Sequence, residues 1–108
     1  MTEDERRVWN HRDAILDLLE DRPVDDIRVS ETIRMTEQGE MANGVWEGHE
    51  QRIVIRRQQL QSLPAFAGTL LHEIAHPRSG GASDLTRRFE DALTQLLGEV
   101  AESALSET

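Results

Sequence analysis

The sequence contains one pattern of residues whose types and spacing could do chemistry, His72-Glu73-Ile74-Ala75-His76. Two histidines four residues apart lie on one face of a helix, about a turn from each other, so both imidazoles can reach one metal ion. A glutamate directly after the first histidine lies beside this face, where it can take a proton from a metal-bound water. The spacing therefore predicts His72 and His76 as metal ligands and Glu73 as a general base.

The residue types in the chain narrow the choice of metal. The chain contains four histidines and no cysteine, which excludes disulfides, thiolate-bound metals, iron–sulfur clusters and thiol nucleophiles. Imidazole and carboxylate are left as ligands, and with this spacing they favour Zn²⁺. The alternative is that both histidines are ordinary helix residues with other hydrogen-bond partners, although burying such groups without partners is costly.

A third ligand would have to be a carboxylate, because no histidine follows His76. A turn near Gly80 that pairs the two last helices antiparallel would put residue 84 opposite His76, so Asp84 is the first choice. In the same register Glu90 would lie beyond the first histidine, and it is the alternative. Asp84 also has a simpler interpretation, as the N-cap of the last helix. The full set of acidic candidates is Asp84, Glu90, Asp91 and Glu99.

The first half of the chain predicts a helix and a hairpin within a single domain over residues 1–108. A capping-box pattern at Thr2 and Glu5 opens a helix predicted over residues 3–20. A hairpin region is predicted over residues 27–57, and its clearest strand is the alternating stretch Arg52 to Arg57. The strand therefore follows the first helix and precedes the helix that carries the histidines.

The second half predicts two helices, which makes the expected fold a small α+β domain. Ser62 and Pro64 are typical of a helix start, and Pro77 is expected to end that helix, so the metal-binding helix is predicted over residues 63–76. Apolar residues at helical spacing predict a closing helix over residues 84–98, with a loose tail from Glu102.

Composition excludes several classes of function. Lys and Arg number 12 against 21 Asp and Glu, a net charge of −9, which argues against binding the phosphates of nucleic acids. The first residues are acidic, which predicts no signal peptide, and the longest mostly apolar run, Leu63 to Leu71, is too short to span a membrane. We therefore expect a soluble, cytoplasmic domain.

The stretch Leu71 to His76 resembles the zinc helix of the zincin metallopeptidases. The residues from Arg52 to Leu60, followed by Ala67 to His72, resemble the edge strand and active-site helix of minimal members of that group. The resemblance covers about residues 44–97. It implies a zincin-like α+β domain in which Zn²⁺ is the cofactor.

Two branches of that group place the third ligand differently. The segment from Asp84 through Phe89 is similar to SprT-like and WLM-like domains, whose third ligand is a histidine four residues before a phenylalanine. Here Leu85 occupies that spacing and Asp84 lies one residue earlier. In the compact minigluzincins the third ligand is a glutamate on a later helix, and Glu90 would match it.

The function that the resemblance implies is hydrolysis of peptide bonds in a peptide or unfolded protein. Zn²⁺ would lower the pKa of a bound water from ~15.7 towards ~7 and polarise the scissile carbonyl, while Glu73 accepts and returns the proton. If the strand from Arg52 lies at the sheet edge, it would hold an extended substrate by strand addition, with Arg52, Val54 and Arg56 as binding residues.

Two other interpretations stay open. One is a catalytically weak or inactive zincin-like module with a structural zinc, which binds a partner protein. The lack of tyrosine in the chain supports this interpretation, because many metallopeptidases supply a second electrophile from Tyr, His or Arg. His49 and Arg78 are the candidates for that role, and both are expected to be surface residues. The other interpretation is an acidic domain associated with a larger protein.

Overall fold

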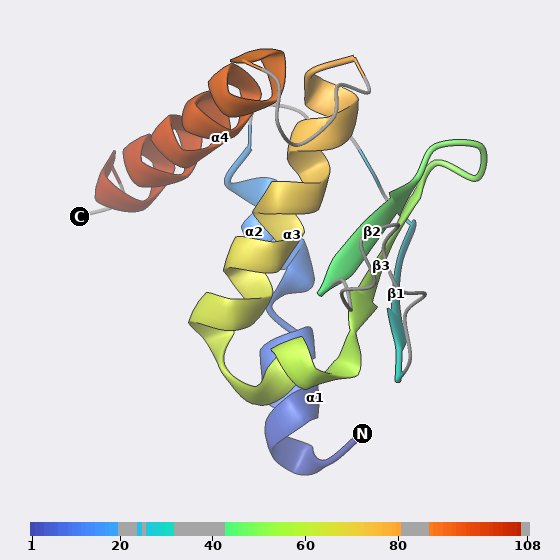
Figure 1. The fold of residues 1–108 in the computed structure, drawn as a ribbon. Helices are drawn as coiled ribbons and strands as arrows, with labels where there is room; N and C mark the ends of the chain where they lie inside the picture. Colours follow the sequence, from blue (N-terminus) through green and yellow to red (C-terminus); the bar gives the residue numbers. More distant parts are fainter. Residues whose placement is uncertain (20–23, 25, 32–42, 81–86, 107–108) are drawn as a thin grey trace.

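The computed structural model describes residues 1–19, 24, 26–31, 43–80 and 87–106. The fold is α+β, as predicted: the long helix α3 runs through the centre of the molecule, with a three-stranded sheet on one side and helix α4 on the other (Figure 1). Within the described ranges, no helix is both long and apolar enough to cross a membrane.

The N-terminal helix predicted over residues 3–20 is two shorter helices, α1 (Glu3–Trp9) and α2 (Arg12–Asp17). At the break, the backbone N–H of His11 donates to the carbonyl oxygen of Val8 at 3.1 Å, three residues back instead of four. This tighter turn interrupts the α-helical ladder. The helix ends at Asp17, so the predicted end at residue 20 is too late; residue 20 itself lies outside the described residues.

The predicted hairpin is confirmed, and it forms part of a mixed sheet. Strands β2 (Gly44–Glu47) and β3 (Arg52–Arg56) pair antiparallel, while β1 (Asp26–Ser30) pairs parallel with β3. The strand order is β1-β3-β2, so β3 is the central strand and its expected edge position is wrong. Ile53 and Ile55 are fully buried. The strand with the most regular sequence pattern is therefore the central strand, which has a neighbour on each side.

Helix α3 (Leu63–Arg78) starts as predicted and ends later. The Ser62 hydroxyl accepts a hydrogen bond from the backbone N–H of Ala65 at 3.2 Å, which is the expected N-cap. Pro77 lies within the helix and does not terminate it. A proline removes only its own donor, and the ladder resumes with the N–H of Ser79 donating to the carbonyl of Ala75 at 3.0 Å.

Helix α4 (Arg87–Ser106) extends well beyond the predicted end at residue 98. The tail expected to be loose from Glu102 is helical as far as Ser106. One contact explains why: the Ser103 hydroxyl donates to the carbonyl oxygen of Leu18 at 2.8 Å, which ties this part of α4 to the end of α2. The predicted start of this helix, residues 84–86, lies outside the described residues.

The core lies between α3 and its neighbours on both sides. Phe66, Leu70 and Ile74 of α3 have no exposed surface. They belong to one cluster with the buried isoleucines of β3 and the apolar stripe of α4, and α3 contacts both elements. The helix that carries the histidine pair therefore packs against the sheet and against α4. These two contacts fix the orientation of its exposed face.

Candidate metal centre

His72, Glu73 and His76 lie together on α3 and form a group that could hold a metal ion. The nitrogen and oxygen atoms that they offer lie within 4.8 Å of one another. The Nε2 atom of His76 is 3.6 Å from the Oε1 atom of Glu73. Ligand atoms around one tetrahedral Zn²⁺ lie about 3–4 Å apart. Small rotations of these side chains would therefore bring the group to metal-binding distances.

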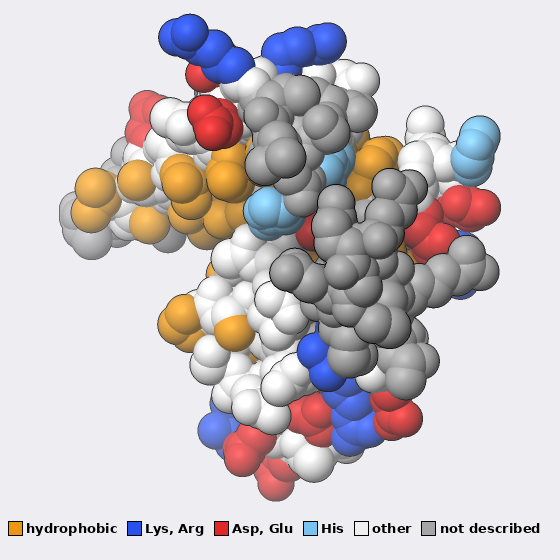
Figure 2. Space-filling model, viewed as in Figure 1, with side chains coloured by type: hydrophobic (Ala, Val, Ile, Leu, Met, Phe, Trp, Pro, Cys, Tyr) orange, Lys and Arg blue, Asp and Glu red, His pale blue; other side chains and the backbone are white. Residues whose placement is uncertain are grey.

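The three side chains differ in their access to solvent. Glu73 is buried, with only 6% of its surface exposed, whereas both histidines are half-buried. Figure 2 shows histidine side chains reaching the surface between α3 and α4, next to hydrophobic side chains of α4. The carboxylate thus lies inside the protein, and the imidazoles lie at its boundary.

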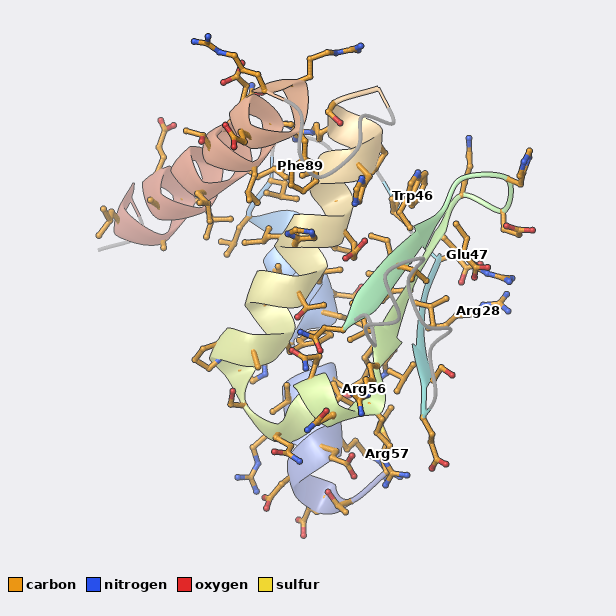
Figure 3. The ribbon with its side chains drawn as sticks, viewed as in Figure 1. Arg28, Trp46, Glu47, Arg56, Arg57 and Phe89 are labelled. Atoms are coloured by element: carbon orange, nitrogen blue, oxygen red, sulfur yellow. The ribbon has the colours of Figure 1, made fainter. Side chains whose placement is uncertain are left out.

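Phe89 of α4 packs against both imidazole rings. Its ring centroid lies 4.9 Å from that of His72 and 4.8 Å from that of His76, with interplanar angles of 63° and 42°. Figure 3 shows this phenylalanine projecting from the first turn of α4 towards α3. The helical spacing of Phe89 in the sequence gives no signal that it would touch both predicted ligands.

Strand β2 lies close to the glutamate because its first residue has no side chain. A Cβ atom added to Gly44 would lie 3.0 Å from Cγ2 of Thr69 and 3.2 Å from Cγ of Glu73. Either distance is tighter than an ordinary van der Waals contact. Gly44 therefore lets β2 approach α3 at the position of the predicted base.

Trp46 adds an aromatic side chain on the same side of β2. It lies opposite the buried Ile53 in the strand register, so both side chains are on the face of the sheet that packs on α3. The indole is half-buried and packs against the core, and Figure 3 shows it between β2 and α3. An aromatic side chain thus lies on the sheet face that packs on α3, two residues after Gly44.

The predicted substrate-binding residues are not at an edge. Arg52, Val54 and Arg56 alternate with the buried isoleucines of β3, so they lie on the sheet face opposite α3. Arg52 is bound to Glu47, with 2.7 Å between Nε and Oε1. Because β3 pairs with a strand on each side, it cannot accept a further strand.

The candidates for the third ligand have different positions in the chain. Asp84 lies outside the described residues. Glu90 is exposed in the first turn of α4, directly after Phe89. Both stay predictions.

Glu99, a further candidate for the third ligand, binds Arg78, a candidate for the second electrophile. The Nη1 and Nη2 atoms of Arg78 donate to the two carboxylate oxygens of Glu99 at 2.8 and 3.1 Å. The Arg78 side chain is only 16% exposed, so its expected surface position is wrong. His49 is exposed in the hairpin turn, as expected.

Comparison with protein-family models, with curated proteins and with solved structures finds no match to this chain. The resemblance to zincins therefore rests on the His-Glu-x-x-His pattern. The structure adds that this pattern lies on a helix, with its ligand atoms close enough to bind a metal ion.

Proposed function

We propose that this chain is a zinc-dependent peptidase in which His72 and His76 bind the metal and Glu73 is the general base. The observation that carries the proposal is the close grouping of two imidazoles and one buried carboxylate on α3, within 4.8 Å of one another. A buried carboxylate beside half-exposed imidazoles suits a reaction that binds substrate at the surface and moves a proton just beneath it.

The donor set fits Zn²⁺. Imidazole nitrogens and a carboxylate oxygen are ligands of catalytic zinc, which takes three protein ligands and keeps one position open. Asp84 or Glu90 would provide the third. Bound Zn²⁺ would supply a Lewis acid for the scissile carbonyl and lower the pKa of a water from ~15.7 towards ~7.

The protein's own residues would handle the proton. Glu73 would accept it from the attacking water and return it to the leaving amine. The position of this carboxylate is fixed by α3 on one side and by the close approach of β2 at Gly44 on the other. Phe89 would restrict the rotation of both imidazoles, which keeps the ligand geometry constant between turnovers.

The substrate would be an extended peptide, or an unfolded protein, that adds to β2. Among the described strands, β2 is the edge of the sheet beside α3, and its backbone is paired on one side only. Extended chains bind such edges through main-chain hydrogen bonds, and side-chain pockets add preference. Trp46 offers an apolar surface there, which favours a substrate with an apolar side chain nearby.

The substitution Glu73→Gln tests the proposal. We expect the wild-type protein to cleave an unstructured polypeptide, and a chelator to abolish the cleavage. The variant should lose at least about 100-fold in rate, because general-base catalysis contributes that much or more. The matched control is Glu50→Gln in the exposed hairpin turn. Wild-type protein that binds zinc without cleaving, or a variant that cleaves normally, would contradict the proposal.

A second candidate function is a binding module with a structural metal. It is favoured by the position of Glu73, whose carboxylate lies only 3.6 Å from the ligating nitrogen of His76 and could itself be a ligand. In a structural site of this kind, Glu73→Gln would lower the zinc affinity. In the peptidase, the variant would keep its zinc and lose only hydrolysis. Measuring the zinc affinity of this variant separates the two.

A further inference from the structure

A buried ion pair connects the helix that carries the histidines to α4. Arg78 binds Glu99 through two parallel hydrogen bonds of 2.8 and 3.1 Å. Their side chains are 16% and 8% exposed. Both charges therefore lie mostly away from water, in a fork geometry that fixes their relative orientation.

The pair lies at the helix contact that shapes the candidate metal centre. Arg78 follows His76 by two residues in the last turn of α3. Glu99 lies on the buried stripe of α4 that begins with Phe89 and continues through Ala92 and Leu96. The same packing of α4 on α3 therefore makes the ion pair and brings Phe89 against the two imidazoles.

Stability alone is a weak reason for such a pair. Two charges removed from water lose about as much as they gain from each other, and apolar residues of similar size are often as stable or more so. What the fork provides is a defined geometry, since two parallel hydrogen bonds hold only one orientation. Because Phe89 lies on the same face of α4 as Glu99, this geometry bears on the contact between Phe89 and the two histidines.

We infer that Arg78 and Glu99 are positioning residues for the metal centre. Their fork fixes how α4 lies on α3, and so holds Phe89 against His72 and His76. The inference rests on the proposed function, because it takes the two histidines as metal ligands. It also gives Arg78 a role other than the second electrophile, since both of its Nη atoms bind Glu99.

The test replaces the pair by apolar residues, in the double variant Arg78→Met with Glu99→Leu. A melting temperature close to that of the wild type would show that the variant is folded and about as stable. We expect Co²⁺, titrated as a coloured substitute for Zn²⁺, to bind about tenfold more weakly, as is typical when the groups that orient ligands are lost. Its visible absorption spectrum should also change. An affinity and spectrum equal to those of the wild type would overturn the inference.

A second measurement needs no metal. In the metal-free protein the ring of Phe89 should shift the NMR signals of the His72 and His76 ring protons. We expect the double variant and Glu99→Gln to lose this shift, and Glu102→Gln, at an exposed position of the same helix, to keep it. Unchanged shifts in all variants would overturn the inference. Wild-type protein that binds no Co²⁺ would instead contradict the proposed function, while the NMR shifts still report on Phe89.

Discussion

Phe89 is the residue through which α4 contacts the candidate metal centre. One aromatic ring contacts two imidazoles at centroid distances below 5 Å, while only 3% of the residue is exposed. Edge contacts between rings are favourable and have preferred geometries, so the phenylalanine restricts both histidines at once. Although Phe89 is not a candidate ligand, it would therefore influence how well the two histidines bind a metal ion.

We predict that Phe89→Leu lowers the Zn²⁺ affinity about tenfold, because the imidazoles lose the ring that orients them. The free energy of unfolding should fall by about 1–2 kcal/mol, since the replacement is apolar but smaller and leaves a small cavity. Calorimetric zinc titration and chemical denaturation measure the two effects. The control is Leu96→Met, on the same buried stripe of α4. If both variants bind zinc equally, Phe89 has no orienting role.

At the scale of single residues, the sequence predicted those groupings of side chains that follow from helix geometry alone. His72, Glu73 and His76 are neighbours on one helix face whatever surrounds the helix, so their spacing was enough. Phe89 and Gly44 could not be predicted in the same way, because their roles depend on how α4 and β2 pack on α3. The partner of Arg78 depends on the same packing.

At the scale of elements, the distance between β2 and α3 is set by one glycine. A methyl group at Gly44 would press on Thr69, on Glu73 and on the carbonyl oxygen of Val54, which would lie 3.3 Å away. Backbone atoms cannot move aside as easily as the end of a flexible side chain. The strand would have to move away from the helix, or the glutamate would have to change position.

We therefore predict that Gly44→Ala lowers the free energy of unfolding by about 1–3 kcal/mol, as overpacking does. It should also reduce hydrolysis more than it reduces zinc binding, because the base moves while the ligands stay. Gly98→Ala in α4 is the matched control, since a Cβ atom there meets nothing within 4 Å. It should raise the free energy of unfolding by about 0.5–1 kcal/mol. Equal effects at both glycines would contradict the close approach at Gly44.

The elements themselves were predicted where local signals decide them. The capping box at Thr2 and Glu5, the Ser62 N-cap and the hairpin are all encoded within a few residues. The length of α4 could not be predicted, because its last turns depend on a contact between Ser103 and Leu18, which are 85 residues apart. The order of the strands also depends on distant pairing, which explains why β3 was wrongly placed at an edge.

At the scale of the whole molecule, a charge network ties the N-terminal helix to the centre of the chain. Arg57 of the 3₁₀ helix η1 (Arg57–Gln61) binds the carboxylate of Glu5 at 2.7 and 2.9 Å and that of Glu31 at 2.6 Å. The hydrogen bonds from Arg57, together with that from the backbone of Thr2, lower the pKa of Glu5 from 4.5 to about 2. Glu5 is also part of the capping box of α1.

This lowered pKa predicts how stability depends on pH. A carboxyl group whose pKa is lower in the folded protein stabilises it above the unfolded pKa, and this contribution is lost as the pH falls to the folded pKa. Glu5→Gln should therefore have a lower melting temperature than the wild type at neutral pH, and the difference should shrink between pH 4.5 and about 2. Glu3→Gln, exposed in the same helical turn, is the control. A difference that stays constant over this range would contradict the account.

The central claim is that His72 and His76 bind one metal ion, and a calorimetric Zn²⁺ titration of the metal-free protein tests it most directly. We predict about one Zn²⁺ per chain for the wild type and loss of this binding in the double variant His72→Ala with His76→Ala. The control, His11→Ala with His49→Ala, removes two exposed histidines and should bind as the wild type does. Folded wild-type protein that takes up no Zn²⁺, or equal binding by both double variants, would contradict the claim.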